Sequence, residues 1–119
     1  MTPKNIEECV RGWFIGDFEP SILRTKEFEV AFMKWQPGPF PNMHYQRVAT
    51  EYNLLVRGRI RFNGKVYNPG DFFIIEPYVV NEGEFLQYSE CVVVKTPSIP
   101  DDKVEIFRNP KITWPGPGV

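Results

Sequence analysis

The sequence predicts an all-β domain, a closed antiparallel barrel or jelly roll, with a minor helical segment near the N-terminus. Several segments alternate apolar and polar residues with a period of two, the pattern of strands that cover a core on one face. These segments are short and are separated by tight-turn sequences, as in barrels and jelly rolls. The 119 residues include 9 glycines and 12 prolines. Together these two residue types are more frequent than the roughly 12% of residues that they make up in an average chain.

The N-terminal part reads as mostly irregular. Asn5 is a candidate N-cap for a short helix over residues 6–10, because its side chain can accept from a free backbone N–H. Gly12 ends this helix. We expect no regular structure over residues 13–19 and one helical turn over residues 21–23.

The remaining chain predicts a series of strands. We expect them over residues 27–36, 43–48, 52–57, 59–62, 65–67, 72–75, 84–88 and 91–96. Asn63-Gly64 lies between two of them and is a strong signal for a two-residue hairpin turn. The whole chain, 1–119, is therefore expected to form one domain. It divides into an N-terminal arm (1–26), a barrel core (about 27–97) and a C-terminal tail (98–119).

Composition excludes several classes of protein. The formal net charge is −1, whereas nucleic-acid-binding domains carry a basic surface. No apolar run approaches the roughly 18 residues that span a membrane, and residues 1–10 have no apolar signal-peptide core. A cytoplasmic location is the resulting expectation, with Cys9 and Cys91 as free thiols. With one histidine and two cysteines, a zinc site made mainly of His and Cys is nearly excluded.

The segment from Gly38 to Gly58 has a specific spacing. Gly38 is followed by five residues, His44, one residue, Gln46, four residues, Glu51, six residues and Gly58. This resembles the first motif of the cupin family, which has the same spacing but a second histidine where Gln46 stands. A spacing match of this kind is weak alone.

A second stretch strengthens the resemblance. Pro69-Gly70-Asp71 is followed by an apolar strand that ends at Pro77, and then by Asn81. The second cupin motif is similar, with a histidine at the position of Asn81. The resemblance covers about residues 27–97 and is closest to small single-domain bacterial cupins. It implies a jelly-roll barrel whose interior holds a divalent metal in typical members.

Residue alternation brings the same side chains together. His44 and Gln46 are two apart, so they point to one face of a strand. Glu51 and Asn53 can share that face on the next strand, and Asn81 would enter from a third. We therefore expect His44, Gln46, Glu51, Asn53 and Asn81 to converge in an apolar cavity, with His44 and Glu51 as catalytic residues and Gln46, Asn53 and Asn81 as ligand-binding residues.

Two interpretations of this pocket stay open. In one, His44, Gln46, Glu51 and Asn81 hold a weakly bound divalent metal (Fe, Mn, Ni or Zn), although two amides are poor replacements for imidazoles. In the other there is no metal, and the same groups form a hydrogen-bonded pocket for an organic ligand. Lys95 follows an apolar strand and is a further acid–base candidate, whereas Tyr45 alternates to the opposite face.

Three functional hypotheses follow. The first is an enzyme acting on a sugar-like molecule or a small carboxylic acid, as an isomerase, epimerase or lyase. Dioxygenase chemistry is less favoured, because it requires a firmly held redox metal. The second is a small-molecule-binding protein without turnover. The third is a structural, metal-free cupin that forms a homodimer through an apolar outer face at Tyr52, Leu54 and Val56. No nucleic-acid or membrane partner is expected.

Overall fold

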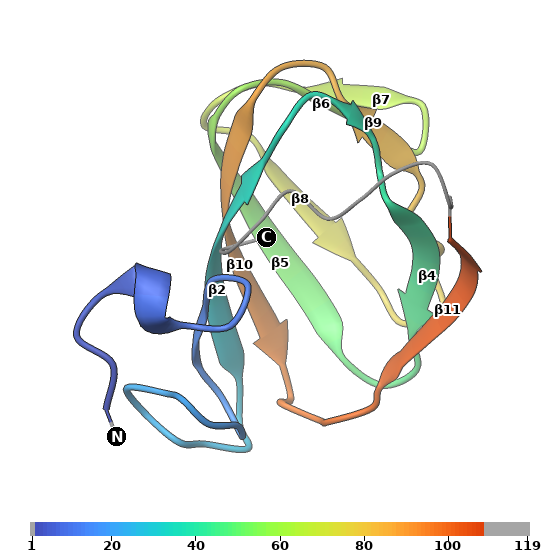
Figure 1. Cartoon of the computed structure of the whole chain (residues 1–119). Coiled ribbons are helices and arrows are strands. Elements are labelled where there is room, and N and C mark those ends of the chain that lie inside the picture. Colours follow the sequence, from blue (N-terminus) through green and yellow to red (C-terminus); the bar gives the residue numbers. More distant parts are fainter. Residues whose placement is uncertain (1, 109–119) are drawn as a thin grey trace.

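The computed structural model describes residues 2–108, in which antiparallel strands form a barrel (Figure 1). A single 3-10 helix, η1 (Ile6–Glu8), precedes the strands of this region. The strands are β1 (Trp13–Ile15), β2 (Glu29–Trp35), β3 (Gly38–Pro39), β4 (Asn42–Gln46), β5 (Thr50–Arg57), β6 (Ile60–Phe62), β7 (Lys65–Tyr67), β8 (Phe72–Ile75), β9 (Gly83–Phe85), β10 (Ser89–Thr96) and β11 (Lys103–Arg108). The all-β prediction is confirmed.

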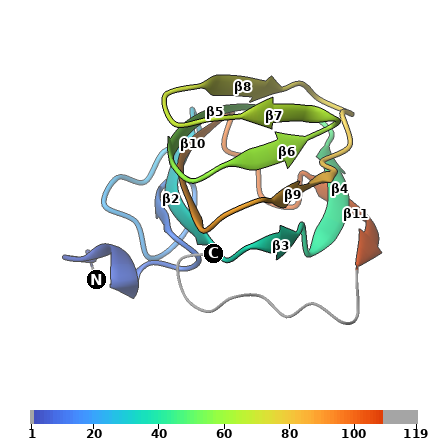
Figure 2. The same ribbon diagram turned by 90° about the horizontal axis from the view of Figure 1, so that it is seen from above.

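Three sheets enclose the barrel interior. The largest has the order β1-β2-β10-β5-β8, the second pairs β11 with β4, and the third has the order β3-β9-β6-β7. Seen from above, β2 and β10 lie on the left of the barrel and β4 with β11 on the right, and the third sheet spans the space between them (Figure 2). Strands far apart in sequence are therefore neighbours, as in a jelly roll.

The core follows the period-two alternation of the long strands. Val93 on β10 pairs with Ala31 on β2 and with Asn53 on β5, and all three are buried. Ile60 and Phe62 are buried on β6, while Arg59 and Arg61 on either side of Ile60 are exposed. Strand alternation thus decides which side chains reach the interior.

Two turns depend on left-handed backbone. Asn63 and Gly64 have φ values of 47° and 85° and join β6 to β7, which is the expected hairpin. Gly58 follows β5 with a φ of 98°. A Cβ at Gly58 would collide with Ser89 Oγ and with the carbonyl oxygen of Tyr88, so the last glycine of the motif is required for close packing of β5 on β10.

The N-terminal arm is more ordered than predicted. Asn5 does cap the first helical turn, by accepting from Glu7 N–H at 2.9 Å, but the helix ends at Glu8. The expectation of irregular structure over residues 13–19 was wrong, because Trp13–Ile15 form β1 and pair with β2. The helical turn expected at residues 21–23 is also absent there. Leu23 instead forms a parallel bridge with Ile15.

Strands also extend beyond the expected barrel core of 27–97. β11 lies in the segment assigned to the tail and pairs with β4 from Lys103↔Gln46 to Arg108↔Asn42. Polar and apolar residues alternate over residues 103–106. This strand signal was overlooked because the acidic residues Asp101 and Asp102 come directly before it. The proline- and glycine-rich end of the tail falls outside the described residues.

The outer face of the large sheet is apolar. Tyr52 pairs with Val94 and Ile74, and Leu54 pairs with Val92 and Phe72. Phe72 is 75% exposed and Ile74 is 55% exposed. The expected outward set of Tyr52, Leu54 and Val56 is thus continued by two neighbouring strands. Such a continuous patch is typical of an interaction surface.

Two remaining predictions concern the cysteines and membranes. Cys9 and Cys91 are buried free thiols, as expected. No helix within residues 2–108 is long and apolar enough to cross a membrane.

Candidate functional site

A cavity of about 180 Å³ lies inside the barrel, between the large sheet and the two smaller ones. Its lining includes the five predicted pocket residues, His44, Gln46, Glu51, Asn53 and Asn81. The structure therefore brings this set together around one space. Their roles as catalytic, ligand-binding or metal-binding residues remain predictions.

His44 and Asn81 form the most closely connected part of the polar wall. The backbone N–H of Asn81 donates to the carbonyl oxygen of His44 at 2.7 Å, which attaches the segment before β9 to β4. The Asn81 side-chain amide lies 3.1 Å from His44 Nε2. In the arrangement where this amide donates, Nε2 accepts and the ring proton resides on Nδ1.

Several buried polar atoms in this wall are unsatisfied. His44 Nδ1, Gln46 Oε1 and Asn81 Oδ1 have no hydrogen-bonding partner within residues 2–108. Each such atom costs about 1–3 kcal/mol when it is buried without a partner. Buried polar groups in native proteins are nearly always paired with protein, water or ligand. The polar wall therefore contains one donor and two acceptors that no group within residues 2–108 satisfies.

Electrostatics keep His44 neutral. Burial lowers the pKa of His44 to about 3, and the positive charges of Lys103 and Lys95 act in the same direction. With this pKa the ring is neutral at pH 7. An unperturbed histidine, with a pKa near 6.5, would be partly protonated at the same pH. His44 is suited to hydrogen bonding as a neutral ring rather than to giving up a proton.

Glu51 behaves in the opposite way. Its side chain borders the cavity deep in the barrel, and burial raises the pKa of its carboxyl group, against the opposing effects of Lys95, the Asn53 hydrogen bond and Lys103. Asn53 Nδ2 donates to Glu51 Oε2 at 3.1 Å, so the carboxyl group is held in one orientation. A carboxyl group with a raised pKa is suited to proton transfer near neutral pH.

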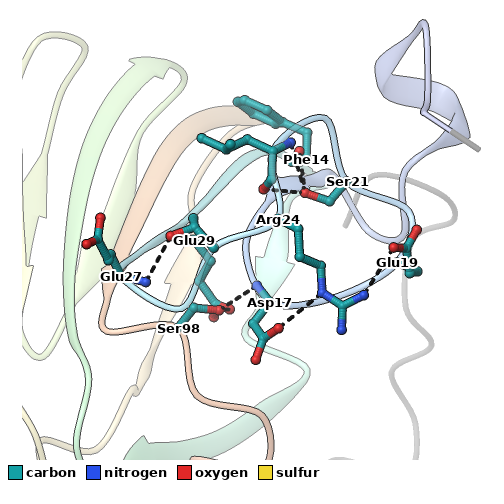
Figure 3. A network of polar contacts seen from close by, with 10 residues as sticks. Phe14, Asp17, Glu19, Ser21, Arg24, Glu27, Glu29 and Ser98 are labelled. Atoms are coloured by element: carbon teal, nitrogen blue, oxygen red, sulfur yellow. Dashed lines mark hydrogen bonds and ion pairs between the residues drawn. The ribbon is translucent and has the colours of Figure 1, made fainter.

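Lys95 also lines the cavity, at the register position opposite Glu51. Its Nζ forms an ion pair with Glu29 at 2.8 Å and lies 4.9 Å from the centre of the Trp13 ring. Ser98 Oγ donates to Glu29 Oε2 at 2.8 Å and accepts from the backbone N–H of Asp17, as Figure 3 shows. Because Glu29 holds Lys95, the lysine supplies a fixed positive charge beside Glu51.

Asp102 positions the loop between β4 and β5. Its carboxylate accepts from the backbone N–H groups of Arg47, Val48 and Ala49 at 2.8–3.1 Å. Asp102 is 4% exposed. This loop connects the strand of His44 and Gln46 to the strand of Glu51 and Asn53, so Asp102 anchors the relative placement of both pairs.

Part of the cavity lining is aromatic. Trp35 stacks on Phe85 with ring centroids 4.8 Å apart, and Phe85 contacts Phe40 at 4.7 Å. Phe62 stacks on Phe73 at 5.6 Å on the same lining. A cavity lined by both polar and aromatic side chains is suited to a ligand with a flat or apolar face and a polar edge.

Sequence reasoning missed part of the lining. Asn42 lies two residues before His44 on β4 and is 3% exposed, so the period-two rule that selected Gln46 would also have selected it. Lys103 was assigned to the tail. Arg11 is a cavity residue that no local pattern indicates. Tyr45 faces away as expected, and its ring stacks on Tyr78 at 5.4 Å.

The donor set does not fit the metals considered above. Iron, manganese, nickel and zinc sites are built from imidazole, carboxylate and thiolate groups. No group of three such residues is present in residues 2–108, and the pocket combines one imidazole, one carboxylate and amides. His44 Nε2 is already engaged with the Asn81 amide, and the charges of Lys95 and Lys103 act on the same space. Cationic surroundings disfavour a further cation.

Comparison with solved structures identifies the fold. A Pac13 variant from Streptomyces, solved with uridine, matches with 12% identity over 71% of this chain and 72% of Pac13, with a TM-score of 0.61. Pac13 is described as a nucleoside dehydratase. A double-stranded β-helix protein from Klebsiella pneumoniae matches with 18% identity over 71% of this chain and 74% of that protein, also with a TM-score of 0.61.

A Bacteroides fragilis cupin matches with 16% identity over 62% of this chain and 69% of the cupin, with a TM-score of 0.51. No protein-family model matches the sequence, and no characterised protein has significant sequence similarity to it. The structural similarities therefore define the class: this chain has the double-stranded β-helix fold of the cupins. At this level the resemblance seen in the two sequence motifs is confirmed.

Proposed function

We propose that this chain binds a small, sugar-like ligand in the barrel cavity and acts on it by metal-independent proton transfer, as an isomerase, epimerase or lyase. The observation that carries the proposal is that His44, Gln46 and Asn81, which line the cavity together with aromatic side chains, each have a buried polar atom without a partner within residues 2–108. A molecule with hydroxyl groups on one edge would satisfy these atoms and cover the aromatic rings.

The chemistry of the polar wall divides the roles. Glu51 is the acid–base residue of the proposal, because it is the carboxyl group with a raised pKa in this cavity. His44 orients the ligand as a neutral hydrogen-bonding group, since its pKa of about 3 makes it a poor acid and a weak base at pH 7. Lys95 stabilises negative charge that develops on the ligand when Glu51 removes a proton. This assignment narrows the catalytic pair expected from sequence to Glu51, with His44 in a positioning role.

The similarity to Pac13 supports the lyase branch, because a dehydratase eliminates water by moving protons on a substrate carbon and oxygen. At 11–12% identity this similarity concerns the fold. The substrate itself is left to experiment.

A thermal-shift screen tests the proposal. The panel consists of hexoses, hexuronates and ribonucleosides, each at millimolar concentration. A ligand at about 100 times its Kd stabilises a folded protein by about 2.7 kcal/mol, which raises Tm by several degrees in a domain of this size. The shift should shrink in Gln46→Leu and Asn81→Leu and persist in Gln87→Leu, whose side chain is exposed. If no class raises the Tm, the proposed binding function is wrong.

A second candidate role rests on the apolar outer face. We propose that a second copy of the chain covers Tyr52, Leu54, Val56, Phe72 and Ile74, as in the structural-dimer hypothesis. The observation that favours it is the continuity of this patch across β10, β5 and β8. This role is compatible with a ligand in the cavity, because the two faces lie on opposite sides of the same sheet.

A further inference from the structure

The turn that follows η1 places an arginine at the cavity. Arg11 and Gly12 are the central residues of a tight turn in which Trp13 N–H donates to the carbonyl oxygen of Val10 at 3.0 Å. Their φ values are 51° and 83°. A residue with a side chain rarely adopts the left-handed region, so its presence there points to a constraint from the surroundings. The carbonyl of Gly12 accepts from Phe32 N–H at 3.0 Å, which attaches the turn to β2.

Arg11 contributes to the lining of the cavity while its side chain remains exposed. These two facts place it at the cavity entrance. Trp13, two residues later, lines the same cavity and contacts Lys95. The arginine is therefore held at the entrance by a short, hydrogen-bonded turn rather than by a long loop.

The guanidinium of Arg11 makes no hydrogen bond or ion pair with any residue in the described range 2–108. Other arginines of this range are engaged: Arg24 pairs with Asp17 and Glu19, and Arg61 pairs with Glu84. Lys95, another cation of the lining, is held by Glu29. Among the described residues, the donors of Arg11 are therefore without a partner.

The surrounding charge favours an anion. The cavity lining contains three cationic residues, Arg11, Lys95 and Lys103, and one carboxylate residue, Glu51, and a second carboxylate, Glu29, pairs with Lys95, which leaves an excess of one positive charge. The chain as a whole has a formal net charge of −1, so this local excess does not reflect a basic protein. A planar guanidinium binds a carboxylate through two parallel hydrogen bonds, a geometry that neutral hydroxyl groups do not match.

We infer that Arg11 is the anion-recognition residue of the cavity and that the ligand carries a carboxylate, which the guanidinium binds at the entrance while the hydroxyl-bearing part reaches the His44–Asn81 wall. This inference rests on the proposed binding function and adds a substrate class to it, small hydroxylated carboxylic acids such as sugar acids. It also adds a specificity residue that the motif positions do not include.

Matched probes test the inference. Galactose has a CH₂OH group at C6, and galacturonate has a carboxylate at the same position. Galactose 6-phosphate carries a phosphate on the oxygen of that CH₂OH group. Titration calorimetry on the wild-type protein should show galacturonate binding at least tenfold more tightly than galactose. Arg11→Gln should reduce this preference to less than threefold without weakening galactose binding. Arg11→Lys should retain part of it, because a lysine keeps the charge but loses the bidentate geometry.

The control variant is Arg59→Gln, at an exposed arginine outside the cavity lining, and it should behave as wild type. Unfolding temperatures of all variants without ligand check that they are folded. Binding of both sugars with a preference unchanged by Arg11→Gln overturns the role of Arg11 and leaves the proposed function intact. If galactose 6-phosphate binds more tightly than galacturonate and this preference depends on Arg11, the claim that the ligand carries a carboxylate is wrong. The anionic group that Arg11 binds is then a phosphate. Absence of binding by all three probes overturns the inference together with the sugar-like ligand on which it rests.

Discussion

His44 and Asn81 are joined twice, through a backbone hydrogen bond of 2.7 Å and a side-chain contact of 3.1 Å at Nε2. The two residues are 37 positions apart and occupy motif positions that hold histidines in the family that the sequence resembles. An amide at one of these positions thus hydrogen-bonds the imidazole at the other. Two candidate metal ligands are therefore hydrogen-bonded to each other. His44 Nδ1 and Asn81 Oδ1 are left without a partner within residues 2–108.

Truncation of Asn81 tests this unit. Asn81→Ala removes the partner of His44 Nε2 and leaves a buried ring nitrogen unsatisfied, so the free energy of unfolding should fall by about 1–3 kcal/mol. Urea denaturation measures it. Gln87→Ala, at an exposed amide, should stay within about 0.5 kcal/mol of wild type. Equal effects of the two changes would contradict the pairing.

The depressed pKa of His44 predicts a pH dependence of stability. The unfolded chain binds a proton at His44 below its ordinary pKa of about 6.5, whereas the folded protein does so only near pH 3. Between these values the unfolded state binds more protons, so stability falls as pH is lowered from about 6.5 toward 3. The raised pKa of Glu51 works in the opposite direction, since it favours the folded state below that pKa.

His44→Gln isolates the first effect because it removes the titrating ring and keeps Glu51. Urea denaturation at pH 7 and pH 4.5 should show a larger loss of stability on acidification in wild type than in His44→Gln. A loss of the same size in both proteins would mean that His44 titrates normally in the folded state.

Restoring imidazoles at the amide positions tests the alignment with the metal-binding motif. The double change Gln46→His and Asn81→His creates a site of three histidines and Glu51, a donor set suited to zinc or nickel. Calorimetry should then show tight binding of Zn²⁺ to the double variant and a Tm that rises with added metal. The wild-type protein should show little of either. A double variant that folds but binds no metal would show that these positions do not converge as described.

Asp102 is predicted to be a stabilising anchor for the β4–β5 loop. Asp102→Ala leaves three backbone N–H groups without their charged acceptor, and each such bond contributes about 1.5–3 kcal/mol. Because water can replace part of this hydrogen bonding, we expect the free energy of unfolding, measured by urea denaturation, to fall by about 3 kcal/mol. Asp101→Asn is the control, because Asp101 is exposed and asparagine tolerates its φ of 62°. An equal loss in the control would contradict the anchoring role.

The proposed dimer predicts a concentration-dependent mass. Light scattering after size exclusion should give twice the monomer mass of 13.9 kDa, and Phe72→Lys with Ile74→Lys should return the protein to a monomer, since charges on a buried apolar face are costly. Arg59→Gln, in the connection between β5 and β6 and outside the apolar patch, should remain dimeric. A wild-type protein that is monomeric at 100 μM would overturn the dimer.

Much of the barrel could be predicted because its signals are local. The alternation in β5 and β6, the Asn63-Gly64 turn and the glycine at position 58 each fix structure within a few residues. β1 was missed because its three residues lie between turn-forming residues, and its partner β2 comes later in the chain. Pairing partners distant in sequence cannot be read from one segment.

In the candidate site too, some residues could be predicted from local sequence and others depend on which strands pair. The motif spacing selected His44, Gln46 and Glu51, strand alternation added Asn53, and the structure places all four around the cavity. The aromatic part of the lining, Arg11 and Lys103 depend on which strands become neighbours across the barrel. The engagement of Lys95 by Glu29 likewise depends on the pairing of β10 with β2. These relationships arise only when the sheets close.

Proton transfer by Glu51 is the central claim, and solvent exchange tests it most directly. A panel compound that binds is incubated with the protein in D₂O, and NMR follows deuterium at its carbon atoms. Wild type and the exposed-site control Glu76→Gln should both incorporate deuterium or form product, whereas Glu51→Gln should bind the compound and slow the exchange by at least 100-fold. Unchanged exchange in Glu51→Gln, or a bound ligand that wild type never exchanges, would contradict the account.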